Sequence, residues 1–135
     1  MRKLSIIILG LAILGVGGAL VVHFNPLCGE EMVMEKAAPD GRYVAVLMTR
    51  NCGATTGYVA HINIRSASSQ LRADFFDGTI KDGEIWGSSK YSGERFCWSS
   101  SRHIEIGYPP EDGGHPQKTW RDVTISDDYR NPACP

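Results

Sequence analysis

Residues 39–57, PDGRYVAVLMTRNCGATTG, decide the fold of this chain. Pro39 presets a turn angle, Asp40 can bond its own backbone and Gly41 accepts a positive φ, so the segment opens with a tight turn. Residues 43–49 follow as YVAVLMT, which is apolar at most successive positions rather than at alternate ones. Such a run is typical of a strand buried on both faces, so we place it in the middle of a sheet.

The turn predicts a β-hairpin whose register can be read from the sequence. If residues 39–41 form a three-residue loop, each residue before the turn faces one that is equally far beyond it. This register sets Glu30 opposite Arg50, which is a favourable pair of opposite charges. It also sets Cys28 opposite Cys52, within reach of a disulfide. The hairpin is therefore expected to be closed covalently at its open end.

The chain begins with a hydrophobic leader, residues 1–27. Residues 4–22 contain a single polar side chain, and as a helix they would be about 28 Å long, close to the hydrocarbon thickness of a bilayer. A cleaved signal peptide is the alternative, but the HFNPL sequence that follows offers no small residues at the cleavage positions. Arg2 and Lys3 favour a cytoplasmic amino terminus. We interpret the leader as a single-pass anchor in a bacterial inner membrane, with residues 28–135 as one domain facing the periplasm or the cell exterior.

Four cysteines follow the apolar segment, and cysteines in an oxidising compartment are expected to pair. The hairpin register selects Cys28–Cys52 among the three connectivities, which leaves Cys97 to pair with Cys134. Closing a loop of about 25 residues should stabilise the domain by roughly 3 kcal/mol.

Beyond the hairpin, the periodicity predicts further strands and no helix. Residues 58–65 alternate between two faces, as expected for an antiparallel strand with one face covered. Turn residues obscure the pattern in residues 79–94. Four more strands are expected from shorter alternating runs, at residues 71–75, 95–99, 103–108 and 119–125. We therefore expect an all-β domain, an antiparallel meander of about seven strands behind an N-terminal transmembrane helix.

Three segments carry a resemblance to a known family: PDGRYVAV at residues 39–46, RNCGATTG at residues 50–57 and FCWSSSRHIEIGY at residues 96–108. With them the chain resembles an uncharacterised family of small bacterial envelope proteins that carry a leader, a PDGxYxAV strand and a CGATTG segment. That family has no established activity. The resemblance therefore implies a location and a fold, and it adds no catalytic residues.

Cys52 and His61 form the one pair with nucleophile and base chemistry that the sequence places together. A thiol nucleophile requires a thiolate and a base within reach, and the expected disulfide removes the thiolate. We therefore predict no catalytic residues, and a thiol or hydrolytic enzyme using this pair is the alternative. The candidate functional loop consists of Gly53, Ala54, Thr55, Thr56 and Gly57, together with His61 on the strand that follows.

No cofactor, metal ion or nucleic acid is expected. A zinc site would combine the cysteines with His61 or His103, but no close Cys/His spacing is present. The loop at residues 53–57 lacks the lysine and the following helix of a phosphate-binding loop. The chain carries 14 Lys and Arg against 15 Asp and Glu, without a basic run, which argues against nucleic acid.

The leading hypothesis is a non-enzymatic, membrane-anchored β domain that binds an unidentified protein or envelope component outside the inner membrane. It rests on the anchor, the oxidised sheet and the lack of a catalytic constellation. One version is an immunity-type protein that blocks an incoming toxin. A purely structural subunit of a membrane complex is a further alternative.

Overall fold

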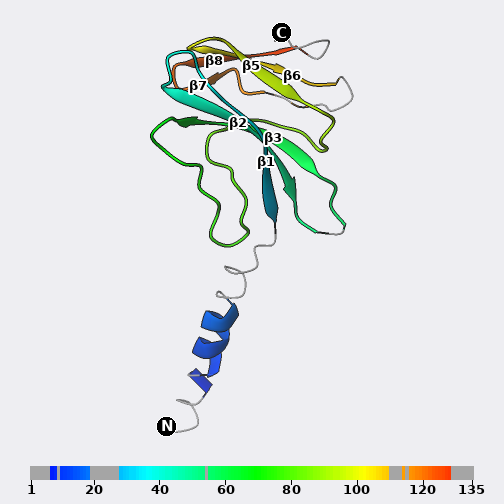
Figure 1. Cartoon of the computed structure of the whole chain (residues 1–135). Coiled ribbons are helices and arrows are strands. Elements are labelled where there is room, and N and C mark those ends of the chain that lie inside the picture. Colours follow the sequence, from blue (N-terminus) through cyan, green and yellow to red (C-terminus); the bar gives the residue numbers. More distant parts are fainter. Residues whose placement is uncertain are drawn as a thin grey trace.

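The computed structural model describes residues 7–8, 10–18, 28–53, 55–109, 114 and 116–128. Residues 10–18 are helical, and the described residues from 28 onward form a β domain with two sheets (Figure 1). Within these described ranges, no helix is both long enough and apolar enough to cross a membrane. Part of the predicted span, residues 4–22, lies outside the described residues. The all-β expectation is confirmed for the described part of the domain.

Each of the two sheets has four strands. The strands are β1 (Gly29–Ala37), β2 (Tyr43–Asn51), β3 (Val59–Ser66), β4 (Glu84–Gly87), β5 (Arg95–Ser100), β6 (His103–Gly107), β7 (Thr119–Trp120) and β8 (Val123–Asp128). The first sheet has the order β1-β2-β3-β4 and is antiparallel throughout. The second sheet has the order β5-β6-β8-β7, in which β6 and β8 are parallel. The predicted antiparallel meander is thus confirmed for the first sheet and wrong for the second.

The parallel pair follows from the way the chain returns to the second sheet. Residues 108–118 separate β6 from β7 in the sequence, and such a connection does not force the next strand to lie beside β6. β7 instead forms a tight hairpin with β8, with Arg121 in the turn at a φ of 51°. β8 then lies between β7 and β6 and runs parallel to β6. The single strand predicted at residues 119–125 is therefore wrong, because the turn at Arg121 divides that stretch into β7 and the start of β8.

The β2 strand is buried on both faces, as its composition predicted. Its first seven residues are all buried. Ala45 and Leu47 belong to the core shared by the two sheets. The alternate side chains face the other way and pack against Leu71 and Ile80, which belong to the long segment of residues 67–83. We call this second face the outer face of the first sheet.

Residues 71–75, predicted as a strand, form none. Leu71 alone among the alternating residues packs against the outer face of the sheet. The Asp74 carboxylate accepts the backbone N–H groups of Phe76 and Asp77 at 2.8 and 3.2 Å, which closes a turn. The next strand beside β3 is β4, which comes from the region where turn residues obscured the pattern.

The β1–β2 hairpin has the predicted register at its open end because two deviations cancel. Ala38 donates its backbone N–H to the Tyr43 carbonyl at 2.9 Å, so the loop has four residues rather than three. A bulge at Val33 then shifts the register by one residue. Glu30 consequently lies opposite Arg50, as predicted.

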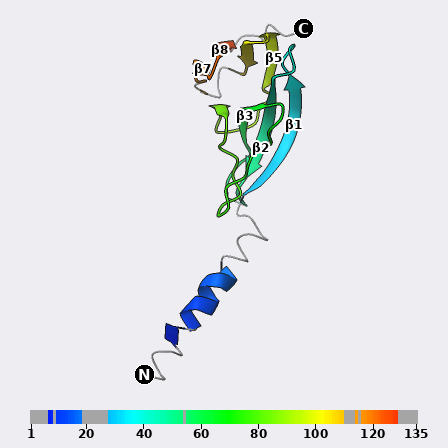
Figure 2. The ribbon, with the colours of Figure 1, turned by 90° about the vertical axis from the view of Figure 1, so that its left-hand side faces the viewer.

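The turn of this hairpin is fastened to the second sheet by a polar clasp. Arg102 binds Asp40 at 2.9 Å and Asp122 at 2.7 Å. The Tyr43 hydroxyl donates to Asp122 at 2.6 Å, and this bond lowers the pKa of the carboxyl group of Asp122. The second sheet therefore packs at the turn end of β1 and β2, and the opposite ends of both strands extend beyond it (Figures 1 and 2).

Candidate functional site

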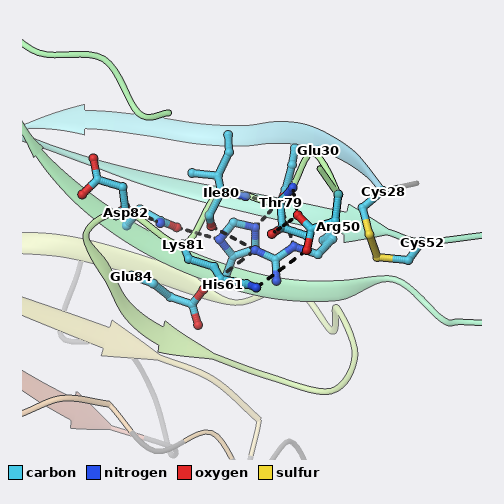
Figure 3. A network of polar contacts seen from close by, with 12 residues as sticks. Cys28, Glu30, Arg50, Cys52, His61, Thr79, Ile80, Lys81, Asp82 and Glu84 are labelled. Carbon is cyan, nitrogen blue, oxygen red and sulfur yellow. Dashed lines mark hydrogen bonds and ion pairs between the residues drawn. A yellow bond between two sulfur atoms is a disulfide. The ribbon is translucent and has the colours of Figure 1, made fainter. Parts of the chain in front are cut away.

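The Cys28–Cys52 disulfide joins the residue before β1 to the residue after β2 (Figure 3). The predicted pairing is therefore confirmed for these two cysteines. Cys97 is also disulfide-bonded, and its predicted partner Cys134 lies outside the described residues. Disulfides of this kind indicate an oxidising, extracytoplasmic location.

The candidate loop after Cys52 closes on itself. Gly53 has a φ of 117°, and its N–H donates to the Asn51 side chain at 2.9 Å. Both the backbone N–H and the hydroxyl of Thr56 donate to the Gly53 carbonyl, at 3.1 and 3.0 Å. Thr55 and Gly57 are exposed, while Ala54 lies outside the described residues. The polar groups of Gly53 and Thr56 thus hold the turn together.

Cys52 and His61 do not form a pair of nucleophile and base in the structure. The sulfur of Cys52 is bonded to Cys28. His61 is only 2% exposed, and its two ring nitrogens contact Glu30 and Asn63. The sequence assigned the face of its strand that carries His61 and Asn63 to the polar side of an alternation. The structure buries both residues because residues 67–83 cover that face.

A buried ion cluster occupies the outer face of the first sheet near the disulfide (Figure 3). The Glu30 cluster, as we call it, consists of Glu30 from β1, Arg50 from β2, and His61 and Asn63 from β3. Arg50 Nε donates to Glu30 Oε1 at 2.6 Å, and Glu30 Oε2 lies 2.7 Å from His61 Nε2. The side chains of Glu30 and Arg50 are 7% and 15% exposed. One carboxylate therefore lies between two basic side chains at a site from which water is largely excluded.

The cluster fastens the segment of residues 67–83 to the sheet. The Ile80 N–H donates to Glu30 Oε1 at 2.9 Å, and Arg50 Nη2 donates to the Ile80 carbonyl, also at 2.9 Å. Asn63 adds a third bond from β3, to the carbonyl oxygen of a residue that follows Ile80 in the same segment. Side chains of three strands therefore hold the backbone of one crossing segment in place.

These bonds decide the charge of Glu30. Burial alone raises the pKa of its carboxyl group, but the hydrogen bonds from the Ile80 amide, Arg50 and His61 outweigh burial and lower the pKa below its ordinary value of 4.5. Glu30 is therefore ionised at neutral pH. A buried charge of this kind is tolerated because it is both paired and hydrogen-bonded.

Acceptor oxygens flank both ring nitrogens of His61. Asn63 donates through Nδ2 to the Asp82 carbonyl at 2.8 Å, so Oδ1 is the atom that lies 2.6 Å from His61 Nδ1. The opposite ring nitrogen faces the Glu30 carboxylate. Both partner groups accept hydrogen bonds and have no proton to donate. The ring of His61 therefore lies between two acceptor oxygens, one at each ring nitrogen.

We expect Asn63→Leu to shift the ring resonances of His61 in NMR spectra that correlate ring protons with nitrogens, because the substitution removes the oxygen that lies 2.6 Å from Nδ1. His103 is the control, because its Nε2 lies 2.8 Å from the Ser126 hydroxyl, on a different sheet. Unchanged His61 ring resonances in Asn63→Leu would contradict this contact.

The sequence predicted the Glu30–Arg50 pair from the hairpin register and missed the other half of the cluster. Asn63 lies two residues after His61, so both point to the same face of β3. This spacing in the sequence indicates that the two side chains are neighbours, but it does not reveal which segment covers their face of the strand. Within the described part of the chain, no group of three or more His, Cys, Asp or Glu side chains is placed to hold a metal ion.

Together the fold and the cluster define a small disulfide-bonded domain of two β-sheets, with a buried ionic clamp under a long crossing segment. A scan against protein-family models, a search of curated proteins and a search of solved structures each found no match. The resemblance to small bacterial envelope proteins accordingly stays a prediction.

Proposed function

We propose that this chain is a membrane-anchored β domain that acts outside the bacterial inner membrane and binds an extended segment of a protein partner along β1. The length and apolar character of residues 4–22 support the anchor. The Cys28–Cys52 disulfide supports the oxidising compartment. An immunity-type role against an incoming toxin is one form of this proposal.

The observation that carries the proposal is the open edge of β1. This nine-residue strand lies at the end of the first sheet and pairs with β2 along one side. An edge strand offers backbone N–H and C=O groups to another strand, which is a common mode of peptide recognition. Met32 and Val33 on this strand are 58% and 41% exposed. Exposed methionine suits such a surface because its flexible side chain adapts to different partners.

The charges along β1 indicate what kind of segment would fit. Glu31 is exposed beside the apolar pair, and Glu35 is bound to Arg65 at 3.1 Å. The part of β1 around Met32 and Val33 therefore carries the exposed carboxylate of Glu31 beside its apolar side chains. A partner segment with alternating apolar residues and a basic residue complements it best.

The enzymatic alternative requires a different redox state. Cys52 in its disulfide has no thiolate, which is the nucleophilic form of cysteine. Both ring nitrogens of His61 are engaged by Glu30 and Asn63. The oxidised domain therefore favours binding over thiol chemistry.

We expect Val33→Arg to weaken partner binding by at least about tenfold, because a long cation would obstruct the apolar part of the edge. Thr124→Arg is the matched control, since it places the same side chain at an exposed β-branched position of β8 in the other sheet. The measurement is capture from intact envelopes with each variant as bait, followed by Kd values for the protein that the native chain captures. Equal binding by both variants would exclude β1 as the binding edge.

A further inference from the structure

Exposed aromatic side chains gather at one end of the first sheet. Among the described residues beyond the N-terminal helix, four aromatic side chains are exposed: Tyr58 at 55%, Phe75 at 56%, Phe76 at 70% and Tyr91 at 41%. We call these four residues the aromatic base. Apolar side chains exposed to this degree and grouped together mark a contact surface.

Backbone contacts place the aromatic base where the chain enters the domain. Cys28 donates its N–H to the Asp77 carbonyl at 3.1 Å, which sets the Phe75–Phe76 turn beside the first described residue of the domain. The disulfide from Cys28 brings in the loop that ends at Tyr58, and Tyr91 donates its N–H to the Tyr58 carbonyl at 3.0 Å. Figure 1 shows the segment of residues 67–83 and the loop after β2 reaching the end of the first sheet that lies away from the second sheet.

The turn that carries the two phenylalanines is held from within. The Asp74 carboxylate accepts the N–H groups of the residues that follow it, and Asp77 Oδ1 accepts both the N–H and the hydroxyl of Thr79 at 2.8 and 2.6 Å. The rings of Phe75 and Phe76 pack edge to face, with centroids 5.4 Å apart. The Asp74 and Asp77 carboxylates thus hold the turn together, while the rings remain exposed.

We infer that the aromatic base rests in the membrane–water interface, with its four side chains among the lipid headgroups. This inference depends on the proposed anchoring by residues 4–22. Six residues lead from Val22 to Cys28, and fully extended they span at most about 20 Å. The anchor therefore keeps the base close to the headgroup region, where aromatic side chains are enriched in membrane proteins.

Basic residues next to the base fit the same occupant. Lys81 follows the phenylalanine turn with its side chain 69% exposed and its Nζ 3.8 Å from Asp77 Oδ2. Lys90 directly precedes Tyr91 and is exposed. Lysines close to a bilayer are attracted to anionic lipids. A base that rests on lipid also directs the second sheet outward (Figure 2) and leaves β1 standing along the membrane normal, open to a partner.

The test uses the full chain in vesicles of phosphatidylglycerol and phosphatidylcholine, the latter brominated near the glycerol end of its acyl chains. Phe76→Trp and Tyr91→Trp are two independent reporters at the base, and Thr124→Trp is the control on the second sheet. We expect both base reporters to lose most of their added fluorescence to the brominated lipid. The control should lose none, relative to the native chain with its own tryptophans.

The outcomes separate this inference from the anchor itself. Vesicle flotation after alkaline washing measures anchoring. A chain that floats with the vesicles while both base reporters stay bright and open to aqueous iodide would overturn the interfacial base and leave the anchor intact. A chain that does not float would overturn the anchor, and the inference with it.

Discussion

Replacing Glu30 with Gln should lower the free energy of unfolding by about 3 kcal/mol, because the substitution removes the negative charge that Arg50 and His61 both contact. Arg50 would keep a weaker partner, Glu84, at 3.8 Å, which places the loss at the lower end of the range for broken buried pairs. His61 Nε2 would face an amide instead of a carboxylate. The measurement is urea unfolding of the full chain in detergent micelles.

Glu31→Gln is the matched control for this substitution. Glu31 is the next residue of the same strand and is exposed, so its exchange should change the stability by less than about 0.5 kcal/mol. If Glu30→Gln unfolds at the same urea concentration as Glu31→Gln, the Glu30 cluster makes no net contribution to the free energy of unfolding.

The lowered pKa of Glu30 gives this effect a definite pH dependence. A carboxyl group with a lower pKa in the folded state stabilises the protein above its unfolded pKa, near 4.5. That stability is lost progressively as the pH falls below 4.5 toward the folded pKa. Subtracting the Glu30→Gln curve from the native curve isolates this carboxylate, because other acidic groups such as Asp40 and Asp77 also have lowered pKa values. The difference should be constant from pH 5 to pH 6 and shrink in acid.

The local parts of this fold were predictable from the sequence. The β1–β2 hairpin depends on neighbours in the chain, so turn chemistry and charge gave both the Glu30–Arg50 pair and the Cys28–Cys52 disulfide. Even there, the sequence did not predict the extra loop residue or the bulge at Val33. Each shifts the register by one residue, and the two shifts cancel.

The non-local parts were not predictable. Whether the face of β3 with His61 and Asn63 meets water depends on where residues 67–83 cross, and alternation in β3 carries no information about that segment. The parallel pairing of β6 with β8 likewise depends on the path of a long connection. Alternation reports that a strand has two different faces, and the tertiary structure decides what covers each of them.

The second large effect is expected at Gly83, where the crossing segment returns to the sheet. Gly83 has a φ of 67°, and a Cβ there would lie 2.0 Å from the backbone oxygen of Ile64. Its own carbonyl accepts the Ile64 N–H at 2.8 Å. Gly83→Ala therefore costs about 1–2 kcal/mol for the left-handed conformation and about 1 kcal/mol for the lost hydrogen bond. With the backbone displacement added, we expect a loss of at least about 3 kcal/mol in the free energy of unfolding.

Gly41→Ala separates the backbone clash from the conformational term. Gly41 has nearly the same φ, 70°, but nothing lies within 4 Å of a Cβ built there. Gly41→Ala should therefore lower the free energy of unfolding only by the cost of the left-handed conformation, about 1–2 kcal/mol. Because Asp82 precedes Gly83 and accepts from Asn63, Gly83→Ala should also shift the ring resonances of His61, whereas Gly41→Ala should leave them in place. If the two variants lose the same free energy of unfolding and the His61 resonances do not shift, the contact at Gly83 does not hold residues 67–83 on β3.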